Sequence, residues 1–92
     1  MSQFSTASPK QFVKDISEGY ILITQGNLRR FSEPELKLLL DNLTIVEREI
    51  RGEQYPETDF ENIKKKNQRL QRIYRTNMIV RGFIKHRRMH LE

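Results

Sequence analysis

The sequence lacks cysteine and tryptophan, and it has no long apolar run. Its 92 residues include only 4 Gly and 3 Pro. The absence of cysteine excludes disulfides, thiolate metal sites and a cysteine nucleophile. No apolar stretch approaches the roughly 20 residues of a membrane-spanning helix, and no basic start followed by an apolar stretch indicates a secretory signal. We therefore expect a cytoplasmic protein that does not associate with membranes, and the size and composition are typical of a small bacterial protein.

Charge is abundant and unevenly distributed along the chain. The sequence holds 17 Lys and Arg against 12 Asp and Glu, which gives a formal net charge of +5. From Asn62 to His90 there are ten basic residues and no acidic residue, whereas residues 1–61 carry seven bases and eleven acids. This asymmetry indicates either an anionic partner or ion pairs within the chain. Some ion pairing with the acids of the preceding segment is expected, but the ten bases outnumber the acids that lie close to them.

Capping patterns predict three helices. Ser8, Ser32 and Thr58 each supply a hydroxyl at a helix N-terminus, with a Gln or Glu three residues later. Apolar residues then recur at spacings of three and four, which is the period of one helical face. The predicted helices span residues 9–25, 33–51 and 58–88.

The segment Tyr20–Thr24 has an alternative interpretation. Its aromatic and β-branched residues favour a short β-strand. A single strand would have no pairing partner within this chain, so we expect the first helix to continue through the segment. Gly26 would then end that helix, because glycine commonly terminates helices.

The expected fold is all-α. We predict a small three-helix bundle in residues 8–88, in which the second and third helices form an antiparallel hairpin and the C-terminal helix is long and basic. Residues 1–7 are expected to be a disordered tail, and residues 89–92 a frayed tail that ends in a probable cloning scar, Leu91-Glu92. The residues predicted to be buried together are Leu39, Leu43, Val46, Leu70, Ile73, Val80 and Ile84.

A basic ridge is the first candidate site. On a helical wheel, four cations of the third predicted helix lie opposite its apolar stripe. They are Lys64, Lys65, Arg72 and Arg75. Such a ridge is consistent with a solvated face that keeps the protein soluble, with contacts to phosphates, or with an acidic protein surface. No zinc-finger spacing, RRM signature or KH-type loop accompanies it.

An apolar patch on the same helix is the second candidate site. Ile79 and Phe83 lie toward the otherwise basic face. Either the first helix packs over them, or they form an exposed patch that docks on a partner or on a second copy of the chain.

Catalytic and metal-binding patterns are not found. His86 and His90 are four residues apart, but their basic neighbours oppose a bound cation. The glycines form no phosphate-binding loop, and no nucleophile and base are paired. We therefore expect no enzyme, no metal, no cofactor and no small-molecule substrate. The predicted function is a protein-interaction module that binds an acidic surface or self-associates, and the alternative is RNA or DNA binding through the same basic helix, for which stacking aromatics are scarce.

Overall fold

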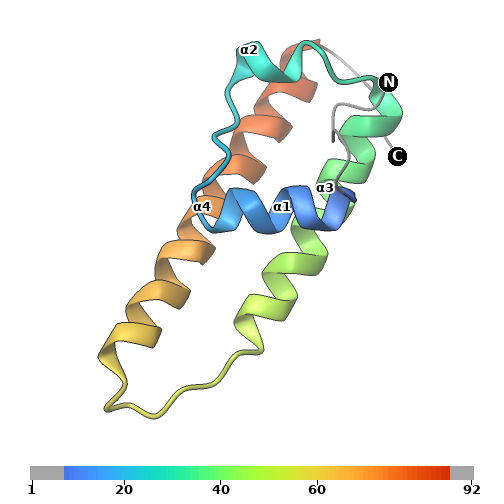
Figure 1. Cartoon of the computed structure of the whole chain (residues 1–92). Coiled ribbons are helices and arrows are strands. Elements are labelled where there is room, and N and C mark those ends of the chain that lie inside the picture. The colour runs from blue at the N-terminus through green and yellow to red at the C-terminus, as the bar shows by residue number, and fades with distance from the viewer. Residues whose placement is uncertain (1–7, 88–92) are drawn as a thin grey trace.

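The computed structural model describes residues 8–87, and these residues form helices and connections without strands. The predicted tails at residues 1–7 and 89–92 lie outside the described residues. The prediction of an all-α fold with a long C-terminal helix is confirmed (Figure 1). In chain order the helices are α1 Pro9–Ser17, α2 Gln25–Leu28, α3 Glu33–Arg51 and α4 Phe60–Arg87.

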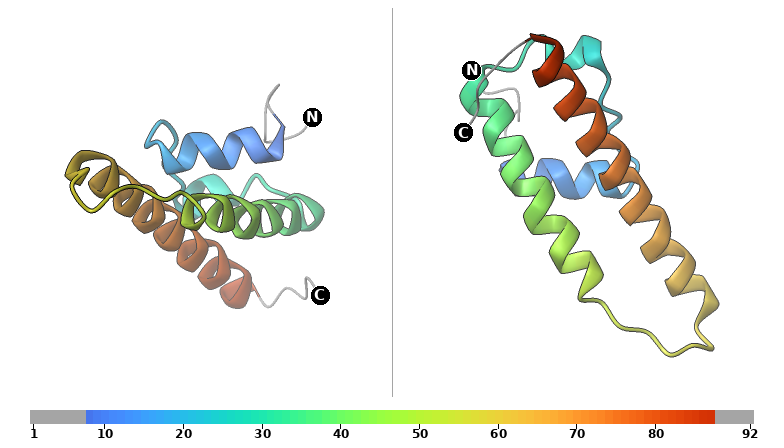
Figure 2. Two further views of the ribbon diagram at one scale, coloured as in Figure 1. Left: turned by 90° about the horizontal axis from the view of Figure 1, so that it is seen from below. Right: turned by 180° about the vertical axis from the view of Figure 1, so that it is seen from behind.

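The helices are arranged in two layers. α3 and α4 run antiparallel as the predicted hairpin, and α1 crosses over one face of that pair, where it contacts both helices (Figures 1 and 2). The single turn α2 packs against α4. Among the helices of residues 8–87, α1 covers one face of the α3–α4 pair, and none of them lies over the other face (Figure 2).

Capping side chains fix where the two best-predicted helices begin. The Ser8 hydroxyl accepts a hydrogen bond from the Gln11 amide at 3.1 Å at the start of α1. At the start of α3, the Ser32 hydroxyl accepts from the Glu35 amide at 3.3 Å, and the Glu35 carboxylate accepts from the Ser32 amide at 2.9 Å. This reciprocal pair satisfies two backbone amides that have no partner within the helix.

We expect Ser32→Ala to lower the free energy of unfolding by about 0.5–2 kcal/mol, because an amide of the first turn of α3 loses its acceptor. Urea unfolding followed by circular dichroism measures the change. Ser32→Asp is the matched control, since aspartate caps equally well and should stay within about 0.5 kcal/mol of the parent protein. An unchanged unfolding midpoint for Ser32→Ala would show that the cap contributes nothing.

The predicted extension of the first helix to residue 25 is wrong. α1 ends at Ser17, and Gly19 follows with a φ of 86°, in the left-handed region that glycine adopts without strain. Tyr20, which lies in the segment expected to continue the helix, is 79% exposed. Beyond the turn, residues 21–24 form neither helix nor strand, and Thr24 has an extended backbone with φ of −128° and ψ of 165°.

The helix α2 was not predicted, and Gly26 lies within it rather than ending a helix. Its N-terminus is capped by Thr24, whose hydroxyl accepts from the Asn27 amide at 3.2 Å while the Asn27 side chain accepts from the Thr24 amide at 3.0 Å. Asparagine here takes the place that Glu or Gln has in the usual capping box. A capping pattern that requires Glu or Gln three residues after the cap therefore does not predict the start of α2.

The start of α4 differs from the prediction by two residues. The helix begins at Phe60, and the preceding Asp59 carboxylate accepts from the Asn62 amide at 3.3 Å and from the Asn62 side chain at 2.8 Å. Asp59 therefore caps the helix in place of Thr58. A carboxylate at this end also interacts favourably with the helix dipole.

The core lies between the two layers. Five of the seven residues predicted to be buried together are buried, whereas Leu70 and Ile84 are partly buried and pack against the core. Residues from α1 and from the segment 21–31 complete it. The buried apolar side chains are Val13, Ile16, Ile23, Leu28, Phe31, Leu36, Leu39, Leu43, Val46, Ile50, Ile73, Val80 and Phe83.

Candidate functional site

Two cations of α4 are used to hold the hairpin link. The Lys66 amine donates to the carbonyl oxygens of Arg51 at 3.3 Å and Glu53 at 2.6 Å, beside the end of α3. The Arg69 guanidinium donates to both carboxylate oxygens of Glu53, at 2.7 and 2.6 Å. A bidentate pair of this kind is among the stronger ionic contacts in proteins. These two side chains therefore have a structural role.

The same ion pair changes the titration of Glu53. The hydrogen bonds from Arg69 lower the pKa of the Glu53 carboxyl from 4.5 to about 2, and the Tyr55 hydroxyl adds a hydrogen bond at 2.5 Å. Glu53 in turn raises the pKa of Tyr55. Of the acids near the end of α3, Glu47 pairs with Arg51 on the same helix and Glu49 pairs with Lys10 of α1, whereas the Glu53–Arg69 pair joins the α3–α4 link to α4.

Arg72 does not belong to a freely solvated ridge. Its Nη1 donates to the carbonyl oxygen of Ser17 at 2.9 Å, at the C-terminus of α1. The side chain also lies against Gly19, where an added Cβ would meet the guanidinium carbon at 3.2 Å. The wheel placed Arg72 opposite the core, but α1 lies over that side of α4 and engages it. Arg72 therefore joins α4 to the turn that ends α1.

The other three cations of the predicted ridge are exposed. Lys65 pairs with Glu61 at 3.2 Å, one turn away on the same helix. Lys64 and Arg75 form no hydrogen bond or ion pair with another residue of the described range 8–87. These two positive charges are available to a partner, and both lie on the outward side of α4.

Phe83 is buried, so it is not part of an exposed docking patch. Its side chain is 5% exposed and belongs to the core, while the Arg87 guanidinium lies 5.1 Å from the centre of its ring. Ile79 is partly buried and packs against the same core. The short helix α2, absent from the prediction, supplies an additional layer against α4. Of the predicted apolar patch, only Ile79 keeps part of its surface accessible.

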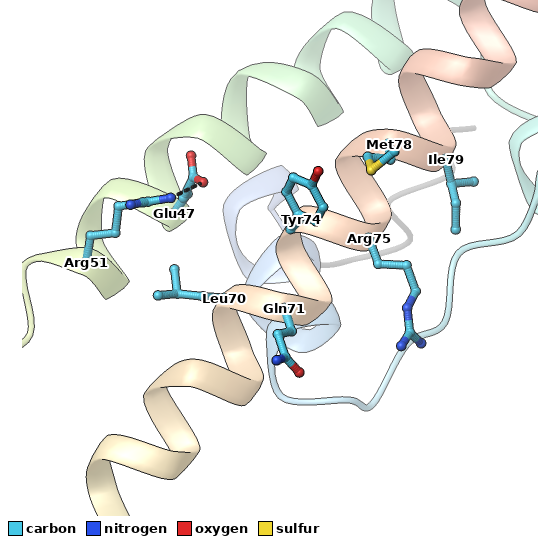
Figure 3. A pocket seen from close by; sticks show the side chains of 8 residues that line it. All are labelled: Glu47, Arg51, Leu70, Gln71, Tyr74, Arg75, Met78 and Ile79. Carbon is cyan, nitrogen blue, oxygen red and sulfur yellow. Dashed lines mark hydrogen bonds and ion pairs between the residues drawn. The ribbon is translucent and has the colours of Figure 1, made fainter.

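A shallow depression of about 660 Å³ lies over α3 and α4 (Figure 3). Leu70 points toward α3, whereas Arg75 and Ile79 extend from the opposite side of α4 (Figure 3). The lining residues are Glu47, Arg51, Leu70, Gln71, Tyr74, Arg75, Met78 and Ile79. Glu47 is the only acid among them, and it is already paired with Arg51 at 3.2 Å.

Tyr74 and Met78 were missed as candidate site residues. They are 64% and 58% exposed, and they lie one helical turn apart on the outward side of α4. The i,i+4 spacing of two large side chains off the apolar stripe was the signal in the sequence. We call the exposed or partly exposed residues Lys64, Tyr74, Arg75, Met78 and Ile79 the outer face of α4.

The described residues bring together no metal-binding group. Within residues 8–87, no three His, Cys, Asp or Glu side chains lie close enough to hold a metal ion. His86 is exposed, and His90 lies outside the described residues. None of the helices in the described range is both long and apolar enough to cross a membrane.

Comparisons with known proteins provide no relative. No protein-family model, no curated protein and no solved structure matches this chain. Any functional argument therefore depends on the surface described above.

Proposed function

We propose that this chain is a non-enzymatic protein-interaction module that binds an acidic protein partner through the outer face of α4. The observation that carries the proposal is Arg75, an exposed guanidinium without a partner among the described residues, next to Tyr74 and within the depression that Met78 and Ile79 line. A cytoplasmic location is part of the proposal, and the lack of cysteine supports it.

The chemistry of this face suits a carboxylate next to apolar groups. A guanidinium binds a carboxylate through two parallel hydrogen bonds, which gives direction as well as attraction. Tyrosine, methionine and arginine are enriched in protein interfaces, because they bury large areas while they keep a polar or adaptable group. Lys64 lies eleven residues before Arg75, so the two charges are about 16 Å apart along the helix.

RNA or DNA binding remains the second candidate, and one observation favours it. Tyr74 is exposed beside Arg75, and an aromatic ring beside a cation is a stacking surface for a base. The number of available cations argues against it, because Arg72 and Lys65 of the predicted ridge have partners within the chain. Tight nucleic-acid binding usually uses several phosphate contacts.

A charge-matched pair of variants tests the proposal. Lys64→Gln with Arg75→Gln removes two charges from the outer face of α4, and Lys37→Gln with Arg48→Gln removes two exposed charges from α3. The probes are labelled poly-glutamate and a labelled single-stranded RNA, and fluorescence anisotropy measures both affinities at low and at physiological salt. We expect the first variant to weaken poly-glutamate binding by about tenfold or more and the second by less than about threefold.

Two outcomes would contradict the proposal. An equal loss of affinity for both variants would mean that poly-glutamate senses only net charge. The nucleic-acid alternative would be established by RNA binding that persists at physiological salt. In that case the slope of log affinity against log salt concentration should also become shallower by about 0.7 for each cation removed from α4. Circular dichroism of all variants checks folding, which such exposed substitutions should change by no more than about 0.5 kcal/mol each.

A further inference from the structure

The connection between α1 and α2 has the properties of an unpaired β-strand. Residues 21–24 belong to no helix, Thr24 at the end of the segment has an extended backbone with φ of −128° and ψ of 165°, and the connection runs alongside α4 (Figures 1 and 2). The backbone amides of Ile21, Leu22 and Ile23 donate no hydrogen bond to another described residue. The residue types Tyr-Ile-Leu-Ile-Thr are those that favour strands. Backbone groups that lack a partner in such a segment are a template for a second extended chain.

The side chains of this segment alternate between core and solvent. Ile23 is buried and Ile21 packs partly against the core, whereas Tyr20 and Leu22 are 79% and 69% exposed. This period of two is that of a strand with one covered face. The core therefore covers one side of the segment, and the exposed side chains form an apolar surface on its other side.

Both ends of the segment are fixed. The left-handed turn at Gly19 places the Tyr20 amide 2.9 Å from the carbonyl oxygen of Asp15, to which it donates. At the other end Thr24 and Asn27 cap α2 reciprocally. A segment held at both ends loses little conformational entropy when it binds a partner.

Arg75 links this segment to the outer face of α4. A small depression of about 90 Å³ lies between the segment and α4, and Arg75 lines it as well as the larger depression of Figure 3. Gly19, Ile21 and Leu22 line the small depression on the side of the segment. An extended chain placed along residues 21–23 would therefore lie close to an available guanidinium.

We propose that the partner contributes an extended acidic segment that pairs with residues 21–23 as an added β-strand and places a carboxylate on Arg75. This inference rests on the proposed function and specifies the form of the partner. Main-chain hydrogen bonds supply affinity in such recognition, and alternate side chains supply specificity. A second copy of this chain is the less suitable occupant, because the net charge is +5 and pairing would bring two Arg75 surfaces together.

Amide hydrogen exchange on the full chain tests the inference directly. The probe is a capped hexapeptide of alternating valine and glutamate, and its two controls carry N-methyl groups on either the valine or the glutamate amides. We expect the peptide to slow exchange by about tenfold or more for at least one amide among Ile21, Leu22 and Ile23. One N-methylated control should bind about tenfold more weakly or worse, since only alternate amides face the pairing edge.

The possible failures are distinguishable. If poly-glutamate binding depends on Lys64 and Arg75 but the hexapeptide leaves exchange at residues 21–23 unchanged, the strand inference is overturned and the proposed function stands. If both N-methylated controls bind as well as the parent peptide, the contact is not a main-chain pairing and the inference is also overturned. Protection that rises with protein concentration in the absence of peptide would identify a second copy as the occupant and would overturn the acidic segment.

Discussion

Replacing Leu43 with alanine is expected to lower the free energy of unfolding by about 2–5 kcal/mol. Leu43 is fully buried at the middle of α3, in the core between the hairpin and α1. The substitution removes apolar contacts and leaves a cavity that its neighbours fill only in part. A core of this size supplies about 3–5 kcal/mol in total. We therefore expect the variant to be largely or wholly unfolded when urea titration is followed by circular dichroism.

Leu38→Ala is the matched control for this prediction. Leu38 lies on the same helix with its side chain half exposed, so the same truncation should cost about 0.5 kcal/mol or less. Ile73→Val is a milder second variant that stays folded, because removal of one buried methylene costs about 0.5–1.5 kcal/mol. A cost below about 1 kcal/mol for Leu43→Ala would contradict the position assigned to Leu43.

The second large effect concerns Glu53 and pH. The Arg69 hydrogen bonds lower the pKa of the folded carboxyl to about 2 from its usual 4.5, so the ionised form stabilises the fold. This contribution is complete above pH 4.5 and is lost as the pH falls toward 2. We expect Glu53→Gln to cost about 1–3 kcal/mol at neutral pH, because it leaves the partly buried Arg69 guanidinium without its charged partner.

The difference in unfolding free energy between the parent chain and Glu53→Gln, measured across pH, isolates the contribution of the Glu53–Arg69 ion pair. Unfolding free energies of the parent chain and Glu53→Gln should converge as the pH is lowered from 4.5 to 2. Glu61→Gln serves as the control, since the Glu61–Lys65 pair is largely exposed and contributes little. A constant difference between parent and Glu53→Gln at every pH would show that the effect is not electrostatic.

Local signals in the sequence predict where α1 and α3 begin, but not where α1 ends. Ser8 and Ser32 cap their helices as predicted, because a capping side chain acts on amides only two or three residues away. The end of α1 depends instead on a contact across 55 residues, from Arg72 to the Ser17 carbonyl oxygen, and on the positive φ of Gly19. Neither follows from apolar spacing, and that spacing continued through Tyr20 and Ile23.

The same distinction explains the outcome for the candidate site residues. The wheel of α4 correctly gave the outward positions of Lys64 and Arg75, since these depend only on the helical period. It could not show that α1 would engage Arg72, because the covering elements come from other parts of the chain. Phe83 was similarly uncertain, since its burial depends on what packs against α4.

The outer face of α4 as the binding surface is the central claim, and an NMR titration tests it most directly. Two-dimensional amide spectra of the isotope-labelled full chain are recorded as poly-glutamate is added at physiological salt. We predict that the largest chemical-shift changes occur at Tyr74, Arg75 and Met78, with smaller changes at Lys64 and no comparable change at Lys37 or Arg48. Largest changes at Lys37 and Arg48, or equal changes at every exposed cation, would contradict the claim.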